Sequence, residues 1–270
     1  MSVINTNVSA LSAQNALRTN ARSMSTNMEQ LSTGSRINSA KDDAAGLAIG
    51  QSMTSQVRGL NMAVRNINDG VNMMQTAEGA MIEQSNMLQR MRELAVQSAN
   101  GTVSTTQRSY LNTEFQALTS QIGNIASQTT WNGTSLMSAT ATFSFQAGAS
   151  SGQTISVVVT GMSTSSLGIS TASISSASVA ASAIATLDTA LNSINSQRAT
   201  IGAGINQMTY AADNISNISA NVTASRSTIM DTDYATASTN LAKNQIIQQA
   251  ATAMLAQANQ QPQSVLSLLK

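Results

Sequence analysis

The chain has 270 residues, 41% of them apolar, and a formal net charge of +1, so it can bury a core but offers no electrostatic footprint for nucleic acid or an anionic membrane. It has no cysteine and no histidine, which excludes disulfides, thiolate metal sites and every catalytic arrangement that needs an imidazole. Aromatic residues make up 3%, so the core must consist of Ala, Leu, Ile, Val and the 15 Met, which suit narrow helix seams. Charged residues make up 9%, so Ser, Thr, Asn and Gln must cover the surface, and such a surface favours dense packing against other copies.

The first 35 residues carry a heptad pattern. Apolar residues recur at intervals of seven, as one position of a coiled-coil seam does: Val3, Ala10, Leu17, Met24 and Leu31. We assign Ala21 and Met28 to the other seam position. Asn7 and Gln14 stand where apolar residues belong, and such polar residues weaken a coiled coil while fixing its register and partner number. The segment is predicted to be a helix that gains order from a partner.

A longer helix is predicted over residues 44–100. Its apolar residues alternate four and three apart: Met53, Val57, Leu60, Val64, Ile67, Val71 and Met74, continuing less regularly through Met81, Leu88, Met91 and Leu94. About 50 residues at 1.5 Å each give a helix about 75 Å long. Asn100-Gly101 is expected to end it, because Gly tolerates the left-handed conformation that follows a helix.

Two further helices share this spacing. One covers residues 105–127 and should fold back antiparallel on the helix before it, because the connection is short. The other covers residues 178–229, and Arg198 interrupts its apolar seam. The only proline, Pro262, interrupts neither. Three seams of one kind predict one antiparallel bundle.

The segment between these two helices has a different pattern. Ala141, Phe143 and Phe145 alternate with polar residues, and GASSG at 148–152 leads into TISVVVT at 154–160, which predicts a β-hairpin. Residues 160–178 are rich in Ser and Thr and predict an exposed irregular connection. Sugar binding by its hydroxyl groups is the alternative interpretation.

The C-terminal pattern repeats that of the first 35 residues. Its seam residues alternate three and four apart: Tyr234, Ala237, Leu241, Asn244, Gln248, Ala251, Leu255 and Ala258. We predict a mainly α fold, a long antiparallel helical bundle with terminal coiled-coil helices and a small central β-hairpin region. Residues 1–40 plus 232–270 would form a terminal coiled-coil domain that is disordered in the monomer. Residues 41–231 would form the bundle domain, with the hairpin and a variable exposed connection at about 140–178.

Residues 31–50, LSTGSRINSAKDDAAGLAIG, join the first helix to the long one. Gly34 is expected to break the first helix and Ser39 to cap the next. Asp42 and Asp43 are placed in the first turn of that helix, where carboxylates favour the positive end of the helix dipole. A metal site at these two carboxylates is the alternative, which the lack of further ligands nearby disfavours.

This junction closely resembles the flagellin family of bacterial flagellar filament subunits. The resemblance continues through GLNMAVRNINDGVNMMQTAEGAM at 59–81, LQRMRELAVQSANGT at 88–102, FQAGASSGQTI at 145–155 and SVLSLLK at 264–270. It implies a structural subunit that self-assembles into the flagellar filament for motility, with end helices in an inner tube and long helices outside them. Large outer domains, which many flagellins insert at mid-chain, have no counterpart here.

The resemblance also implies a location and partners. The chain is expected outside the cell in the flagellum, exported by flagellar type III secretion, and the N-terminal residues have neither the basic nor the apolar region of a cleaved signal peptide. The expected partners are other copies of the chain, hook–filament junction and filament cap proteins, and an export chaperone. No membrane insertion is expected, because no stretch approaches a span of about 18 apolar residues.

Individual residues inherit roles from the resemblance. The segment 88–97 matches the one that the vertebrate receptor TLR5 reads, where Gln89, Arg90 and Leu94 face the receptor and Glu114 contributes from the next helix. The same four residues are expected to serve primarily as axial assembly contacts. Terminal coiled-coil assembly is assigned to Val3, Ala10, Leu17, Met24, Leu31, Leu241 and Leu255. The tail residues Leu266, Leu268 and Leu269 resemble the segment bound by the export chaperone and sensed by cytosolic NAIP-type receptors.

No catalytic, cofactor-binding or metal-binding residue is expected, so the chain is predicted not to be an enzyme. GAGIN at 202–206 lacks the Lys-Ser/Thr of a phosphate loop, and its glycines are interpreted as close-packing sites. Two alternative functions are a hook–filament junction protein, which resembles flagellin at both termini, and a surface glycan-binding filament protein. The single tryptophan, Trp131, leaves little aromatic surface for stacking sugars.

Overall fold

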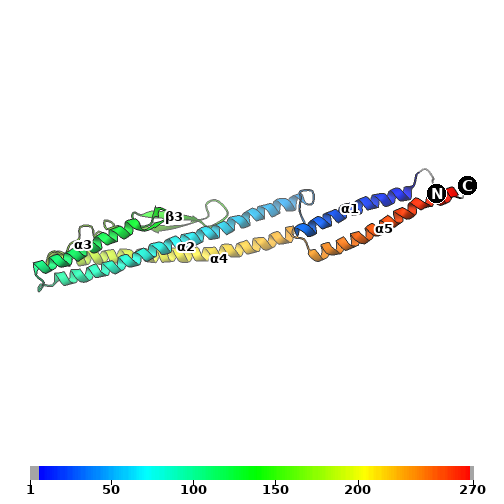
Figure 1. The fold of residues 1–270 in the computed structure, drawn as a ribbon. Helices are drawn as coiled ribbons and strands as arrows, with labels where there is room; N and C mark the ends of the chain where they lie inside the picture. Colours follow the sequence, from blue (N-terminus) through cyan, green and yellow to red (C-terminus); the bar gives the residue numbers. More distant parts are fainter. Residues whose placement is uncertain (1–5, 268–270) are drawn as a thin grey trace. The chain divides into compact units, whose positions relative to one another are not determined.

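The computed structural model describes residues 6–267, with side chains described through residue 260 (Figure 1). The elements in chain order are α1 (Val8–Thr33), α2 (Ala44–Ala99), α3 (Thr105–Gln128), β1 (Thr130–Trp131), β2 (Thr134–Ser135), β3 (Ala141–Gln146), β4 (Thr154–Val159), α4 (Ala177–Met230) and α5 (Tyr234–Ser267). This order confirms the predicted fold class of a mainly helical bundle with terminal helices and a small central hairpin. The chain divides into two compact units, residues 1–55 with 221–270 (unit 1) and residues 56–220 (unit 2).

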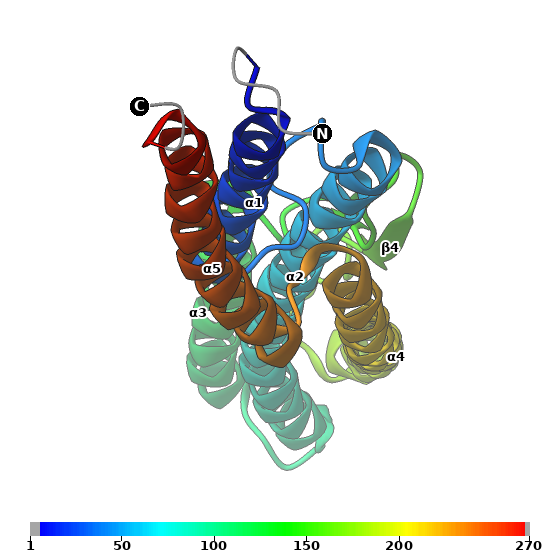
Figure 2. The ribbon, with the colours of Figure 1, turned by 90° about the vertical axis from the view of Figure 1, so that its right-hand side faces the viewer.

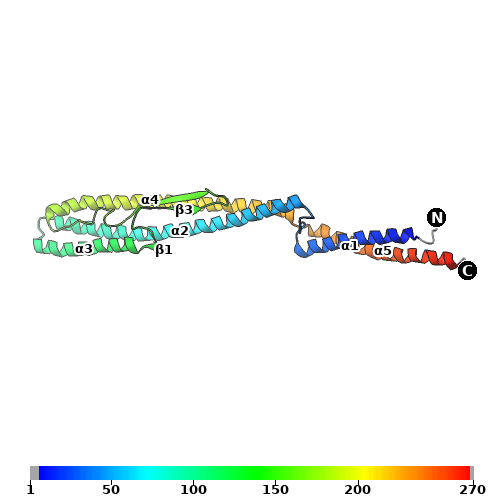
Figure 3. The same ribbon diagram turned by 90° about the horizontal axis from the view of Figure 1, so that it is seen from above.

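Unit 2 holds a continuous apolar core. Figure 3 shows α2, α3 and α4 running side by side there, with the β3–β4 hairpin against them. The largest fully buried side chains are Phe115, Ile67, Met74, Met81, Leu88, Met91, Leu94, Ile122, Leu136, Met137, Met162 and Ile169. Unbranched methionines adapt to the irregular spaces between helices, which explains how a core with so few aromatic residues can close.

The hairpin packs on the helices at two glycines. β3 and β4 pair antiparallel, with Phe145 opposite Ile155 and Phe143 opposite Val157. A Cβ atom on Gly70 of α2 would lie 2.9 Å from the Phe145 ring, and one on Gly204 of α4 would lie 2.9 Å from a Val157 methyl group. The close-packing interpretation is therefore confirmed for Gly204, while Gly202 has nothing within 4 Å of its Cβ position.

The connection between β4 and α4 is irregular and only partly exposed, because buried apolar residues are spaced among its exposed polar ones. Met162, Leu167, Ile169 and Ile174 are buried in the unit 2 core. Side chains on the helices satisfy its carbonyl groups, since Gln84 Nε2 donates to Met162 O at 3.1 Å and Ser98 Oγ donates to Ile174 O at 2.6 Å. The Ser and Thr residues mark the outer side of this segment, and its widely spaced apolar residues anchor it.

The structure contains a second hairpin, which is not predicted above. β1 and β2 pair antiparallel around Asn132 and Gly133, whose φ angles are 47° and 79°. An Asn-Gly pair with both residues at positive φ is the usual two-residue hairpin turn, because its twist matches that of the strands. The dipeptide was the available signal, although each strand has only two residues.

The start of α2 differs from the prediction. The helix begins at Ala44, and the Asp43 carboxylate caps it by accepting the Gly46 N–H at 2.8 Å. Asp42 Oδ2 instead accepts the Ser39 hydroxyl and the Ser39 N–H, both at 2.9 Å. These hydrogen bonds, the hydroxyl first, lower the pKa of Asp42. Ser39 therefore does not cap α2. Its hydroxyl and N–H groups donate to Asp42, in the turn that precedes the helix.

Candidate assembly surfaces

The α1 and α5 helices of unit 1 lie side by side and antiparallel (Figures 1 and 2). Two asparagines of the α1 segment reach across to main-chain carbonyls of α5. Asn7 Nδ2 donates to Ala258 O at 2.7 Å, and Asn20 Nδ2 donates to Asn244 O at 2.8 Å. The predicted seam residues are half-buried between the helices: Ala10, Leu17, Met24, Leu31, Leu241 and Leu255. Val3, Leu268 and Leu269 lie outside the described residues, as does the side chain of Leu266.

The second seam position of α1 was assigned to the wrong residues. Ala21 and Met28 are exposed, whereas Asn20 is buried and Asn27 is half-buried. A step of three or four from Leu17 satisfies the seam spacing equally well, so the sequence pattern permits either set. The choice of the apolar set was wrong because the buried Asn20 amide has a main-chain acceptor on α5.

Large apolar side chains remain exposed on both helices of this pair. The exposed fractions are 61% for Val8, 54% for Leu11, 56% for Met28, 67% for Ile246 and 65% for Met254. Asn20 is the only residue of α1 that is buried. Two helices alone cannot cover each other on more than one side, so the pair leaves apolar surface available to further helices.

The chain segments at the junction end of this pair are joined through the main chain. Thr232 N–H donates to Gly34 O at 3.0 Å, and Arg36 N–H donates to Met230 O at 2.7 Å. The Arg36 guanidinium also donates to Ile229 O, from Nη2 at 2.7 Å and from Nε at 3.2 Å. Ile229 lies in the last turn of α4, where carbonyl groups lack helical partners and a cation is favoured. This role of Arg36 is not predicted from the sequence, in which a basic residue just past the Gly34 break is the available signal.

Asp233 caps α5. Its Oδ1 accepts the N–H groups of Ala235 and Thr236 at 3.0 and 3.3 Å, and its Oδ2 accepts the Thr236 hydroxyl at 2.8 Å. These hydrogen bonds, the hydroxyl first, hold the pKa of Asp233 below its usual value of 3.8. The charged carboxylate therefore stabilises the first turn of α5.

The surface expected to contact axial neighbours lies on α2 and α3 of unit 2. Arg90 Nε donates to Glu114 Oε1 at 2.9 Å, and Arg90 Nη1 donates to Glu93 Oε2 at 3.0 Å. The hydrogen bond that Arg90 donates to Glu114, followed by the one that it donates to Glu93, raises the pKa of Arg90. Gln89 is exposed beside them, but Leu94 is only 1% exposed. The expectation that Leu94 faces outward is wrong, because it continues the buried positions of Leu88 and Met91 at a spacing of three.

A shallow depression adjoins this surface. Gln89, Arg92, Glu93, Val96 and Gln97 line it, and Val96 is half exposed. Arg92 Nε donates to Asp188 Oδ1 at 2.7 Å, which raises the pKa of Arg92 and links α2 to α4. The depression thus combines a half-exposed apolar side chain with charged side chains held by ion pairs, a combination that suits a protein contact surface.

The described part of the chain also limits other kinds of site. Across residues 6–267, no three His, Cys, Asp or Glu side chains gather where they could hold a metal ion. None of the helices described in that range combines the length and the hydropathy needed to cross a bilayer.

Comparisons with known proteins agree along almost the whole chain. The model for the bacterial flagellin N-terminal helical region matches residues 4–142, and that for the C-terminal helical region matches residues 184–269. The chain is 41% identical to the flagellar filament 33 kDa core protein of Treponema phagedenis and 42% identical to a flagellin of Halalkalibacterium halodurans, in each case over 99% of this chain and 100% of the relative. The crystal structure of Bacillus cereus flagellin superimposes with a TM-score of 0.50 at 32% identity, covering 56% of this chain and 88% of that one. The chain belongs to the bacterial flagellin family.

Proposed function

We propose that the α1–α5 pair is the element through which this structural subunit polymerises into the flagellar filament. The observation that carries the proposal is the set of large apolar side chains exposed on α1 and α5, Val8, Leu11, Met28, Ile246 and Met254 among them. Burying one such side chain against a neighbouring copy contributes about 1.5 to 3 kcal/mol. Each subunit added to a polymer gains this free energy of burial, whereas a monomer in water leaves the same side chains exposed.

The same proposal covers the domain organisation. Residues 1–40 and 232–270 act as a terminal coiled-coil domain that is disordered in the free monomer, and residues 41–231 act as the bundle that keeps the monomer folded. The polar seam residues support the disorder, because a helix pair with Asn and Gln in its seam is marginal in water. Neighbouring subunits would supply the order.

Removal of residues 231–270 tests this function. The truncated chain should remain a folded monomer that fails to sediment as filaments when seeds or salt are added. A matched full-length variant, Ile246→Ser with Met254→Ser, keeps the seam and removes only exposed apolar surface, so it should raise the critical concentration for polymerisation. Polymerisation of the truncated chain at the critical concentration of the full-length chain would reject the proposal.

A second role, detection by a vertebrate TLR5-type receptor, is supported by the exposed Arg90–Glu114 pair with Gln89 beside it. Receptor binding would use monomers and compete with axial packing for this surface. Arg90→Ala should lower reporter activation by purified monomer. Arg58→Ala, which changes an exposed arginine on the same helix, is the control. An equal response to both variants would exclude this assignment of Arg90.

The remaining partners belong to export and assembly. We propose that the chain leaves the cell through flagellar type III secretion and that an export chaperone covers its C-terminal leucines until then. Junction and cap proteins would contact the two ends of the filament. Cytosolic NAIP-type receptors would read the same tail. An apolar tail that must stay unpaired before assembly needs a groove to cover it. Leu266→Asp should weaken chaperone binding in a pull-down, with Ser267→Asp as the neighbouring control.

A further inference from the structure

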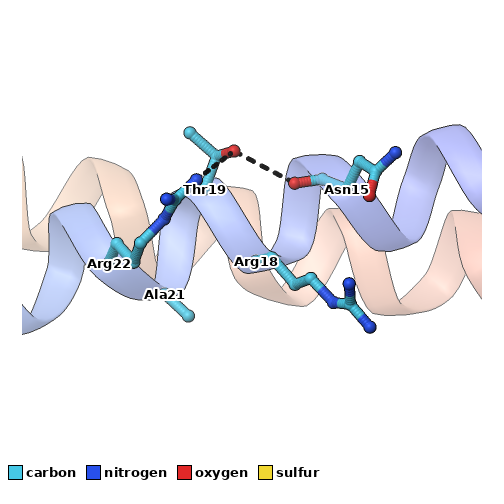
Figure 4. A pocket seen from close by; sticks show the side chains of 5 residues that line it. All are labelled: Asn15, Arg18, Thr19, Ala21 and Arg22. Carbon is cyan, nitrogen blue, oxygen red and sulfur yellow. Dashed lines mark hydrogen bonds between the residues drawn. The ribbon is translucent and has the colours of Figure 1, made fainter.

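A group of cations on the α1–α5 pair has no carboxylate partner among the side chains that the structure describes. Asn15, Arg18, Thr19, Ala21 and Arg22 line a shallow depression on α1, and Figure 4 shows both guanidinium groups extending from the helix there. Among the described residues, the hydrogen bond that the Arg22 guanidinium donates is the one from Nη2 to Thr19 Oγ1, at a long 3.5 Å. Lys243 is exposed on α5 at the same level, because its neighbour Asn244 accepts the Asn20 amide. Arg18, Arg22 and Lys243 are called the cationic band below.

The acidic residues on α1 and in the segment just before α5 lie at a different level along this pair. Glu29 is the only acidic residue in α1, and α5 has none. Asp231 and Asp233 lie near the junction, where Thr232 N–H donates to Gly34 O. The undescribed terminal residues contain no Asp or Glu either. Charges of opposite sign are therefore separated along the pair, and among the described residues no salt bridge joins them.

The separated charges share one face of α1. Arg18, Arg22 and Glu29 stand at intervals of four and seven, so they point to nearly the same side of the helix. At 1.5 Å per residue, Glu29 lies about 10 Å along the axis from Arg22 and about 16 Å from Arg18. All three are exposed. A side chain cannot bridge this distance within one helix, but it can reach a neighbouring helix that is shifted along the axis.

We infer that the cationic band of one copy pairs with Glu29 of a second copy, and that this contact sets the axial offset between neighbouring α1–α5 pairs in the polymer. Copies packed without an offset would place like charges together. An offset of about 10 to 16 Å places each cationic band against a carboxylate. Apolar side chains alone would not select an offset, because their attraction is not directional. Charge complementarity supplies the register.

The inference rests on the proposed polymerisation through α1 and α5, and a charge-swap experiment tests it separately. Arg22→Glu and Glu29→Arg should each raise the critical concentration for seeded polymerisation by at least about fivefold at low ionic strength, measured by sedimentation. The double variant R22E/E29R restores opposite charges and should return within about twofold of the unchanged chain. Single variants that polymerise normally, or a double variant no better than the singles, would overturn the inference.

Two controls separate this contact from other effects. Arg58→Glu makes the same change in net charge at an exposed arginine of unit 2, and an equal effect there would count against a local contact. At about 1 M salt the Debye length is about 3 Å, so the difference between R22E and the unchanged chain should largely disappear. A difference that persists would indicate a damaged α1 helix and would reject the electrostatic contact. Polymerisation of the chain that lacks residues 231–270 would reject both the proposed function and this inference. Unchanged critical concentrations for the charge variants alone would reject this inference and leave the proposed function intact.

Discussion

The same apolar repeat forms a buried core in unit 2 but only a half-buried seam in unit 1. In unit 2 the seam residues of three helices and a hairpin meet, and leucines such as Leu187 reach full burial. In unit 1 the corresponding leucines of α1, such as Leu17, are only half-buried, and the one buried residue of α1 is an asparagine. The repeat itself therefore does not decide between a core and a contact surface. The number of elements that close around a seam does.

The largest expected effect comes from replacing a leucine by alanine in unit 2, compared with the same replacement in unit 1. Leu187→Ala removes a fully buried side chain and should lower the free energy of unfolding of unit 2 by about 2 to 5 kcal/mol. Leu11→Ala, at a residue 54% exposed, should leave that free energy within about 0.5 kcal/mol while raising the critical concentration for polymerisation. Urea unfolding of the monomer and sedimentation of the polymer measure the two outcomes. Equal destabilisation of unit 2 by both changes would contradict this difference between the two units.

A fully buried glutamine of unit 2 gives the next effect. Gln84 is fully buried, and its Nε2 donates to Ile122 O at 3.2 Å and to Met162 O at 3.1 Å. Gln84→Met keeps the volume but leaves both carbonyls without this donor, so unit 2 should lose about 1 to 3 kcal/mol. Thermal unfolding of the monomer measures the loss. An unchanged melting temperature would show that the packing of the connection does not depend on these bonds.

The buried polar residue of unit 1 should behave in the opposite way. Asn20→Leu removes one hydrogen bond but fills the seam with an apolar side chain, which should stabilise the free α1–α5 pair by about 1 kcal/mol. Circular dichroism of the monomer should show more helix. Because the register bond to Asn244 is gone, electron microscopy should show less regular filaments. A loss of monomer helicity would mean that Asn20 stabilises the pair as Gln84 stabilises the core.

The smallest effect concerns pH. Because the pKa of Asp233 is lowered in the folded chain, its contribution is complete above the ordinary value of 3.8 and is lost as the pH falls through the lower folded value. The first turn of α5 should therefore fray, and polymerisation weaken, only at pH values below about 4. Asp233→Asn keeps a capping side chain and should flatten this part of the pH profile. An identical profile for the variant would assign the acid sensitivity to other carboxylates.

Helical spacing predicts the extent of the helices better than it predicts the burial of single residues. Residues 44–100 were predicted as one helix and α2 covers Ala44–Ala99, because a four-and-three alternation sustained over many turns has no competing interpretation. The assignment of Ala21 rather than Asn20 to the seam was wrong, since both residues fit the spacing and the deciding acceptor is a carbonyl 224 residues away from Asn20. Leu94 was placed outward on the resemblance although its spacing pointed inward, and the spacing was right.

The junction bonds between Gly34 and Thr232 also bear on the order in which the chain folds. These residues are 198 positions apart (232 − 34), so pairing them in an unfolded chain closes a very long loop. Once residues 56–220 have folded as unit 2, only residues 35–55 and 221–231 remain to be closed, which is 21 + 11 = 32 positions. Since loop-closure entropy grows with the logarithm of length, this lowers the free-energy cost by about 1.5 kcal/mol. The connectivity thus makes the end helices the last to join.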